Sequence, residues 1–420
     1  MKRVVIVGMG FGGLRAAQAL AGKGMEVIVV DRQNYHLFQP LLYQVATAAL
    51  EQETIAYPIR AMIRRWEGVH FRLAEVYGAD LAGRRLFISG GVIDYDYLIL
   101  AAGSITNFFG MKSMESHAFD LKKLNHAVEL RNHILCSFER AATELDPIRR
   151  RGLLTFVIVG GGPTGVEFAG ALAELSRFVL TKDYPELHAT VPRIILVEAT
   201  GRLLAAFPET LQSYALEKLK RMGVEVLLND RVIDAEEERV LLQDNKVIPA
   251  HTVFWSAGVS AAPLAARLDV PKAAGGRIPV QPDLTLAGHP EVFVIGDLAY
   301  LVQDEAPLPM VAPVAMQQGE YAGEAVVACH LGKSMPPFRY RDKGTMATIG
   351  RNAAVATVQE KNYSGFVAWI VWLGLHLYYL IGFRNRILVL LNWAHNYLFY
   401  ERQVRLITRE EKDEKSLNCG

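Results

Sequence analysis

Two stretches of the chain show the same succession of apolar and polar positions. In the first, a β-branched run at residues 3–7 is followed by glycines at GxGxxG spacing (Gly8, Gly10 and Gly13), an alanine-rich segment at 14–22 and a second apolar run at 26–30. This order predicts a buried parallel strand, a tight turn, a helix and a second strand. Asp31 ends the second strand, 23 positions after Gly8.

The second stretch repeats this order about 150 residues later. Residues 155–159 are the predicted strand, Gly160, Gly162 and Gly165 repeat the glycine spacing, and 166–175 is the predicted helix. The next strand, 193–198, ends in Glu198, 38 positions after Gly160 and thus later than the usual ~20. We interpret the excess, residues 177–192, as a helix extension and a loop.

Each part of this pattern has a role in binding a dinucleotide. The first glycine permits the turn, the second lets the backbone approach a pyrophosphate, and the third lets helix and strand pack closely. The acid at the end of the second strand accepts from a ribose hydroxyl. Glu198 therefore favours NADH over NADPH, whereas Arg202, four residues later, would soften that preference.

Later strand ends indicate that the second module is inserted in the first. Residues 96–103 and 291–297 are predicted strands ending in small residues and in Gly-Asp, and both complete the first sheet. The strand end at 255–259 resembles that at 101–103. We expect an α/β fold with two Rossmann-like domains, one for FAD and one for a nicotinamide dinucleotide. Taken alone, Asp297 is better explained as a helix N-cap.

The C-terminal region has a different pattern. Residues 365–383 are apolar on all sides of a predicted helix, 384–386 (Arg-Asn-Arg) interrupt it, and 387–400 form an amphipathic helix whose polar stripe extends to Arg402 and Gln403. Its many tryptophan and tyrosine side chains favour a lipid–water interface. The alternatives are a dimer interface or an ordinary core. We expect helices lying on the membrane rather than a single span, and we expect residues 409–420, which are charged, to be disordered.

Composition narrows the classes of protein to which the chain can belong. The 420 residues allow two or three domains, and a net charge of +1 gives no general argument for binding nucleic acid. The cysteines, Cys136, Cys329 and Cys419, are far apart in sequence, which argues against a disulfide framework and a CxxC pair. We expect no metal site. The N-terminus superficially resembles a signal peptide, but strand, turn and helix account for every residue, so we expect a cytoplasmic N-terminus.

Four motifs give the chain a family resemblance. They are Gly-Gly-Gly-Pro-Thr-Gly-Val-Glu at 160–167, Asn-Tyr-His-Leu-Phe-Gln-Pro-Leu-Leu-Tyr-Gln-Val-Ala at 34–46, Val-Ile-Gly-Asp-Leu-Ala at 294–299 and Ala-Pro-Val-Ala-Met-Gln-Gln-Gly at 312–319. The chain resembles the type II NADH dehydrogenases, single-subunit NADH:quinone oxidoreductases, over all but its last dozen residues. The resemblance implies non-covalent FAD, NADH as substrate, a membrane quinone as acceptor and monotopic attachment through the C-terminal helices.

The resemblance also implies a set of binding residues. Those expected for FAD are Gly8, Gly10, Phe11, Gly12, Gly13, Asp31, Arg32, Gln44, Val45, Ala46, Ala101, Ala102, Gly103, Gly296, Asp297 and Ala315. Those expected for NADH are Gly160, Gly161, Gly162, Pro163, Thr164, Gly165, Glu198, Ala257 and Gly258. The expected domains are 1–115 and 271–340 for FAD, 116–270 for NADH, and 341–420 as a C-terminal region with membrane-associating helices at about 365–403.

Two residues are expected to be catalytic. Glu167 would lie beside nicotinamide and quinone, where a carboxyl can orient a ring or deliver a proton; otherwise it only complements a helix dipole. Gln317 matches the family's quinone pattern Ala-Gln-x-Ala-x-Gln together with Ala312 and Ala315, but Pro313 replaces the first glutamine and cannot donate to a quinone carbonyl. Without the family, Gln317 would be an ordinary exposed helix residue.

The expected function is transfer of hydride from NADH to FAD and of two electrons to quinone, without proton pumping. We expect a homodimer at the cytoplasmic face of the cell inner membrane, with no nucleic acid as partner. A sulfide:quinone reductase would need reactive cysteines near the flavin, and Cys136 and Cys329 lack such contexts. A flavoprotein that senses NADH, or that uses another acceptor, is the remaining alternative.

Overall fold

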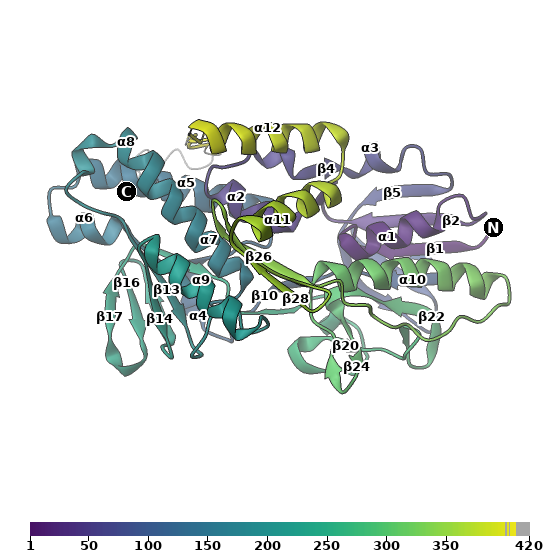
Figure 1. The fold of residues 1–420 in the computed structure, drawn as a ribbon. Helices are drawn as coiled ribbons and strands as arrows, with labels where there is room; N and C mark the ends of the chain where they lie inside the picture. Colours follow the sequence, from purple (N-terminus) through teal and green to yellow (C-terminus); the bar gives the residue numbers. More distant parts are fainter. Residues whose placement is uncertain (400, 403, 409–420) are drawn as a thin grey trace. The chain divides into compact units, whose positions relative to one another are not determined.

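The computed structural model describes residues 1–399, 401–402 and 404–408 (Figure 1). The chain forms two compact units, each assembled from three segments. Unit 1 contains residues 1–37, 56–105 and 259–343, and unit 2 contains residues 38–55, 106–258 and 344–420.

Unit 1 is built on a six-stranded sheet with the order β21-β22-β9-β1-β2-β5. Strands β22, β9, β1, β2 and β5 run parallel, and β21 pairs antiparallel with β22. Helix α1 (Phe11–Leu20) packs against α10 (Ala312–His330), and the two lie side by side in Figure 1. The bounds of the other main elements are β1 Arg3–Val7, β2 Glu26–Asp31, β3 Tyr35–Leu37, β4 Ala56–Pro58, α3 Ile59–Ile63, β5 Val69–Leu73, β6 Val76–Asp80, β7 Arg85–Ile88, β8 Gly91–Asp94, β9 Tyr97–Leu100, β21 Thr285–Leu286 and β22 His289–Val294.

The close approach of α1 and α10 follows from small residues on both helices. A Cβ added at Gly319 would lie 2.1 Å from the carbonyl oxygen of Gly12, and one added at Gly323 would lie 2.6 Å from the Cβ of Ala19. Side chains at these positions would push the helices apart, so the glycines fix how α10 lies over the first glycine loop.

Unit 2 is built on a second parallel sheet, with the order β11-β18-β12-β13-β14. Every residue of β12 (Thr155–Val159) is buried, as expected for a central parallel strand. The bounds of the other main elements are α2 Leu42–Ala46, α4 Lys112–His117, β11 Ala118–Phe119, α5 Leu124–Thr143, α6 Pro147–Leu153, α7 Pro163–Glu174, α8 Thr181–Asp183, β13 Arg193–Glu198, α9 Glu209–Arg221, β14 Val224–Leu228, β15 Val232–Glu236, β16 Arg239–Leu242, β17 Val247–Pro249 and β18 Thr252–Trp255.

Two sheets of this kind confirm the predicted fold class, including the return of β22 to the first sheet after the second module. The predicted helix extension at 177–192 is also present, as a π-helical segment at 175–180 followed by α8 and a short 3-10 turn. The predicted domain limits remain a proposal.

The C-terminal part of unit 2 contributes a three-stranded sheet and two helices. Strands β26 (Thr345–Gly350), β27 (Ala353–Val358) and β28 (Lys361–Ser364) pair antiparallel in this order. Helix α11 (Gly365–Tyr379) packs on this sheet, and α7 packs on β26. A Cβ added at Gly170 of α7 would lie 1.7 Å from the carbonyl oxygen of Ile349, so this glycine sets the spacing between helix and strand.

One predicted boundary in this region is wrong. Helix α12 (Phe383–Phe399) already includes Arg384, Asn385 and Arg386, which were expected to separate the two helices. The chain instead turns at residues 380–382, where Gly382 has a φ of 88°. The guanidinium of Arg386 then donates to the carbonyl oxygens of Tyr378 and Leu380, at 2.8 and 2.7 Å, so the arginine caps the end of α11.

Three other expectations fall partly or wholly on residues that the structure does not describe. Tyr400 and Gln403, predicted to extend the second helix and its polar stripe, lie outside the described residues, as does the predicted disorder of 409–420. No helix within the described residues is both long enough and apolar enough to cross a bilayer.

Candidate active site

The first glycine loop joins β1 to α1 in unit 1. Gly8 has a φ of 96°, and a Cβ there would lie 2.4 Å from the carbonyl oxygen of Ala101. A Cβ at Gly13 would lie 1.8 Å from the carbonyl oxygen of Gly8, so both positions require glycine. Gly10, the N-cap of α1, instead faces open space, with nothing within 4 Å of an added Cβ. This opening in front of a helix N-terminus is suited to a pyrophosphate.

Asp31 is fixed beside this loop. Its carboxylate accepts from the backbone N–H of Met9 at 2.7 Å and from that of Gln33 at 2.8 Å. Burial raises the pKa of Asp31, and these hydrogen bonds oppose the rise. The neighbouring Arg32 is exposed, and the ring of Phe11 lies edge-on to His36 at 5.4 Å.

The later FAD candidates of unit 1 gather at the ends of neighbouring strands. Ala101, Ala102 and Gly103 follow β9, while Gly296 and Asp297 follow β22, which pairs with β9. Ser104 donates to the carboxylate of Asp297 at 2.5 Å, and the buried Gln318 accepts from the Gly296 N–H at 2.7 Å. Ala315 of α10 lies close to Gly296: a Cβ added at Gly296 would be 3.3 Å from the Cβ of Ala315.

The second glycine loop, in unit 2, has the same construction. Gly160 has a φ of 106°, and a Cβ at Gly165 would lie 2.0 Å from the carbonyl oxygen of Gly160. Gly162, the N-cap of α7, faces open space, with nothing within 4 Å of an added Cβ. Pro163 and Thr164 are exposed in the first turn of α7, where proline is well tolerated.

Glu198 takes the place in this loop that Asp31 takes in the first. Its carboxylate accepts from the Gly161 N–H at 2.6 Å and from the backbone and hydroxyl of Thr200, both at 2.8 Å. On the other side of the loop, the Ser256 hydroxyl donates to the Val159 carbonyl oxygen at 2.9 Å. Ala257 lies against Gly160, and Gly258 follows it.

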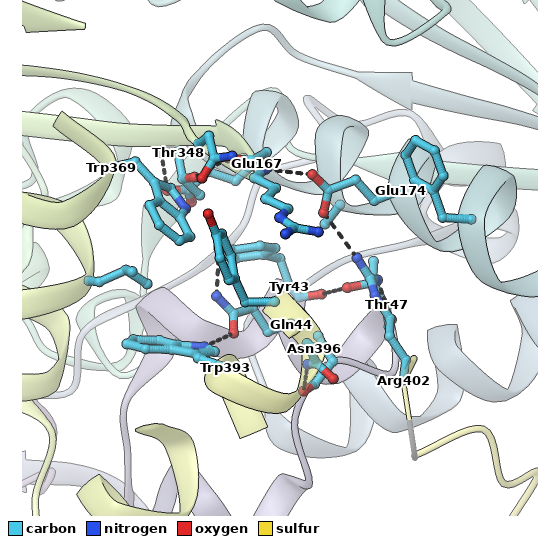
Figure 2. Close-up of a pocket in the computed structure, with 18 of the residues that line it drawn as sticks. Tyr43, Gln44, Thr47, Glu167, Glu174, Thr348, Trp369, Trp393, Asn396 and Arg402 are labelled. Atoms are coloured by element: carbon cyan, nitrogen blue, oxygen red, sulfur yellow. Dashed lines mark hydrogen bonds and ion pairs between the residues drawn. The ribbon is translucent and has the colours of Figure 1, made fainter. Parts of the chain in front are cut away.

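A pocket of about 330 Å³ opens elsewhere in unit 2 (Figure 2). Its apolar walls include the rings of Trp369, Trp372 and Trp393, and its polar lining includes Gln44 and Glu167. The lining therefore combines residues of α2, α7, β26 and both C-terminal helices. Flat aromatic walls with a few polar groups are typical of a site for a planar organic molecule.

Glu167 is the partly buried acid of this pocket. It projects from α7 one turn before Gly170, and its Oε1 accepts from the Thr348 N–H of β26 at 3.2 Å. Burial raises the pKa of Glu167 to about 8, although Thr348 and the nearby Trp372 indole lower it. The carboxyl is therefore mostly protonated at neutral pH and can donate a proton, which a surface acid in a helix turn cannot do.

A chain of hydrogen bonds leads from α12 into the pocket. The Trp393 indole donates to Gln44 Oε1 at 2.7 Å, and Gln44 Nε2 donates to the Tyr43 hydroxyl at 2.8 Å (Figure 2). Burial, followed by the nearby Glu167 charge, raises the pKa of Tyr43 well above its usual value. Val45 and Ala46, the other candidates on this short helix, are buried.

Charged groups occupy the opposite side of the pocket. Buried Arg402 donates to the Thr47 carbonyl oxygen at 2.6 Å and pairs with Glu174 at 3.4 Å. The other carboxylate oxygen of Glu174 accepts from the Arg351 N–H at 2.5 Å. The guanidinium of Arg351 lies over the Tyr397 ring, 3.9 Å from its centre, a cation–π contact.

Gln317 lies in unit 1, on α10. Its Nε2 donates to the Arg341 carbonyl oxygen at 2.9 Å, and its Oε1 accepts from the Arg341 N–H at 3.0 Å. Pro313 lies in the first turn of the same helix, as expected. The amide of Gln317 thus holds the backbone at 341, a role that the sequence did not predict.

Several site residues were missed by the sequence reasoning. Tyr43, Trp372, Trp393 and Arg351 were not assigned individually, although Tyr43 lies in a motif that was recognised and both tryptophans lie in helices that were singled out for their aromatic content. Arg351 lies in the hairpin between β26 and β27, and no motif or spacing in the sequence indicated a role for it.

Comparison with known proteins decides the family. The model of the pyridine nucleotide-disulphide oxidoreductase family matches residues 2–319, and that of the NDH2 C-terminal domain matches residues 343–402. The type II NADH:quinone oxidoreductase Ndh of Mycobacterium tuberculosis is 39% identical over 97% of this chain and 91% of its own length. The chain belongs to the type II NADH:quinone oxidoreductase family.

Three further comparisons give lower sequence identities. The internal alternative NAD(P)H-ubiquinone oxidoreductase A1 of Arabidopsis thaliana is 30% identical, with 94% of this chain and 84% of the relative covered. The structure of NDH2 from Plasmodium falciparum in complex with NADH superposes with a TM-score of 0.88, at 18% identity over 97% of this chain and all of that one. The sulfide:quinone oxidoreductase of Aquifex aeolicus shares the fold at a TM-score of 0.73 and 15% identity, over 96% of each chain.

Membership in the type II NADH:quinone oxidoreductase family implies FAD as cofactor and NADH as substrate, and the two loops fit such molecules. Each loop leaves open space before a helix N-terminus at its second glycine, Gly10 or Gly162. Each also has a carboxylate at the end of the next strand, Asp31 or Glu198, in the position that binds a ribose.

Proposed function

We propose that this protein is an NADH:quinone oxidoreductase that does not pump protons. The observation that carries the proposal is a pocket lined by three tryptophans and by Glu167, an acid whose pKa is raised by burial, in a chain 39% identical to a type II NADH:quinone oxidoreductase. When bound, FAD would accept hydride from NADH and pass two electrons to the quinone.

For the cofactor and substrate we propose the loops as assigned from the sequence. The residues proposed to hold FAD are Gly8, Gly10, Phe11, Gly12, Gly13, Asp31, Arg32, Gln44, Val45, Ala46, Ala101, Ala102, Gly103, Gly296, Asp297 and Ala315. Those proposed to bind NADH are Gly160, Gly161, Gly162, Pro163, Thr164, Gly165, Glu198, Ala257 and Gly258. The hydrogen bonds that fix Asp31 and Glu198 support this assignment, because they hold each carboxylate at the loop before a ribose arrives.

The pocket of unit 2 is proposed to receive a quinone ring. Trp369, Trp372 and Trp393 would stack with or flank the ring, and the protonated Glu167 carboxyl would donate to a quinone oxygen that gains charge on reduction. For Gln317 we propose the quinone contact implied by the family pattern. An amide nitrogen carries two hydrogens, so Nε2 can donate one to Arg341 and the other to a quinone oxygen.

We also propose that α11 and α12 attach the protein to a lipid surface. The polar side of α12 faces the protein: Asn396 donates to the Ala49 carbonyl oxygen at 3.0 Å, and the buried Asn385 donates to that of Glu53 at 3.3 Å. The outward side is apolar except for the exposed Arg384 and Arg386 in the first turn. Its most exposed side chains, each more than half exposed, are Phe383, Leu390, Leu391, Leu398 and Phe399.

A helix on the surface of a protein in water has its apolar side toward the protein and its polar side toward solvent, and α12 has the opposite arrangement. Helix α11 shows the same outward face through Phe366, Val367 and Ile370, while Ala368 and Trp372 are buried. A lipid-soluble acceptor would be available at such a surface. The cytoplasmic face of the cell inner membrane and a homodimer are proposed from the family resemblance, and the mass of the detergent-solubilised protein tests the dimer.

An anaerobic titration tests the function. NADH should bleach the flavin spectrum of the purified protein, and a ubiquinone or menaquinone analogue should restore it. Failure of NADH to bleach the flavin would overturn the proposal. Bleaching without turnover on any quinone would favour an NADH sensor.

Two further measurements test for cysteine chemistry and for proton pumping. Unchanged NADH:quinone activity after Cys136→Ser and Cys329→Ser would exclude a cysteine role of the sulfide:quinone reductase kind. Proton translocation coupled to turnover in sealed vesicles would contradict the absence of pumping.

A further inference from the structure

Phe109 has an unusual backbone conformation beside the second glycine loop. Its φ is 52°, in the left-handed region that costs a non-glycine residue roughly 1–2 kcal/mol. The backbone N–H of Phe109 donates to the Asn107 side-chain oxygen at 2.8 Å, which stabilises the turn. Conformations of this kind persist only where the surrounding structure enforces them, and they are concentrated at binding sites.

Asn107 ties this turn to the end of β18. Its backbone N–H donates to the Gly258 carbonyl oxygen at 3.1 Å, and its carbonyl oxygen accepts from the Trp255 indole at 2.9 Å. Main-chain and side-chain groups of one asparagine therefore all serve to place residue 109 over the strand end.

The ring that is placed in this way remains largely open to solvent. Phe109 is 62% exposed, although its edge contacts the buried Trp255, with ring centres 6.3 Å apart. A Cβ at Gly258 would lie 2.8 Å from the Phe109 ring, so a side chain at residue 258 would displace the ring from this position. The adjacent Phe108 is different, because it packs against the core of the unit with Met111. Core packing therefore explains why Phe108 is an aromatic residue, but it does not explain why Phe109 is one.

The strand order indicates which part of a dinucleotide meets this ring. In the sheet of unit 2, β12 carries the glycine loop, with β13 and Glu198 on one side and β18 on the other. A dinucleotide lies across the carboxyl ends of such strands, with its pyrophosphate at the loop and its adenine ribose at the acid. Its nicotinamide half then extends over the end of β18, at Ala257 and Gly258.

We propose that Phe109 is a binding residue for the nicotinamide half of the dinucleotide, against which the nicotinamide or its ribose packs. This inference rests on the proposed NADH function of the loop. An exposed aromatic face offers a large contact area for a flat heterocycle at little cost in side-chain entropy. The strained turn keeps the face in position before the substrate arrives.

Binding of NAD⁺ and of ADP-ribose to the oxidised holoenzyme, measured by calorimetry, tests the proposal. ADP-ribose lacks the nicotinamide ring but retains the pyrophosphate and the adenosine. Phe109→Ala should weaken NAD⁺ binding about tenfold and change ADP-ribose binding less than twofold. Phe109→Tyr should restore NAD⁺ binding, and Phe87→Ala, at an exposed phenylalanine of β7 in unit 1, should alter neither ligand.

Equal weakening of both ligands by Phe109→Ala would overturn the proposal, because the residue would then act through the fold of the loop. Unchanged binding of both would overturn it as well. Phe109→Leu provides a second variant if the alanine protein does not fold, with the same ratio expected. Wild-type protein that binds neither ligand would overturn the proposed function together with this inference, and that outcome differs from the other two.

Discussion

Among single residues, Glu167 gives the clearest dependence of stability on pH. Its pKa is about 8 in the folded protein and 4.5 when unperturbed. Between these values the folded state holds a proton that the unfolded state has released, so stability falls as pH rises through this range. The slope is about 1.4 kcal/mol per pH unit for one proton, and it disappears below the lower value and above the upper one.

Glu167→Gln should remove this slope, because glutamine has no proton to lose. Urea unfolding of wild type and variant at several values between pH 5 and 9 measures the difference. The variant should gain relative stability as pH rises. Parallel pH profiles for the two proteins would show that Glu167 ionises normally, as an acid exposed in a helix turn would.

We expect Glu198 to determine the choice between the two nicotinamide dinucleotides. A carboxylate held beside the loop accepts from a 2′-hydroxyl and repels a 2′-phosphate. Glu198→Ala should raise the ratio of kcat/KM for NADPH to that for NADH by roughly ten- to a hundredfold, chiefly by improving the reaction of NADPH. Glu236→Ala, at a carboxylate that pairs with Arg239 on a surface hairpin, is the matched control. A ratio that stays constant would mean that Arg202 or the loop backbone decides specificity.

At the scale of elements, α12 is connected to α2 through side chains. Trp393 holds Gln44 and thereby Tyr43, while Asn396 holds the chain just beyond α2. Losing a partner from a largely buried hydrogen bond costs roughly 1–3 kcal/mol and frees Gln44 to rotate. A helix on the outside of the protein thus positions polar groups inside the pocket.

Trp393→Phe should therefore raise the KM for a short-chain quinone several-fold and slow anaerobic flavin reduction by NADH much less, because Gln44 is only one of the residues proposed to hold FAD. Phenylalanine keeps most of the ring and removes the indole N–H. Trp66→Phe, in unit 1, controls for a general effect of losing a tryptophan. If flavin reduction slowed as much as quinone reduction, the bond would serve the fold of the unit rather than the pocket.

The elements also show what the sequence could predict. Both glycine loops, their strands and their acids follow from local spacing, because the turn, the helix and the ribose contact all lie within about 40 residues of each other. The pocket does not follow from local spacing. Its residues come from α2, α7, β26, α11 and α12, and their meeting depends on contacts such as Gly170 against Ile349.

The helix boundary at residues 380–382 shows a second limit. Arginines between two apolar runs predict a loop between two helices, since a charged side chain interrupts an apolar pattern. In the structure Arg386 turns back and caps the preceding helix, and the actual turn is set by Gly382. Local composition located both helices but could not tell which residues joined them.

For the whole molecule, we expect the apolar outward faces of α11 and α12 to attach the protein to a lipid surface. Each fully buried leucine contributes about 1.5–3 kcal/mol, so replacing two exposed leucines by glutamate should reduce partitioning into vesicles by more than tenfold. Leu390→Glu/Leu391→Glu should therefore lose flotation with phosphatidylcholine vesicles, and high salt should not release the wild type, because the contact is apolar. Turnover on a short-chain soluble quinone should persist, because these side chains point away from the protein.

The control variant is Leu73→Glu, at a leucine of β5 that is 55% exposed, and it should still float with the vesicles. If the double variant floated as well as wild type, the outward face would not be the lipid-binding surface. A second copy of the chain would then be the alternative occupant of this face. In that case the mass of the detergent-solubilised variant should fall to that of a monomer.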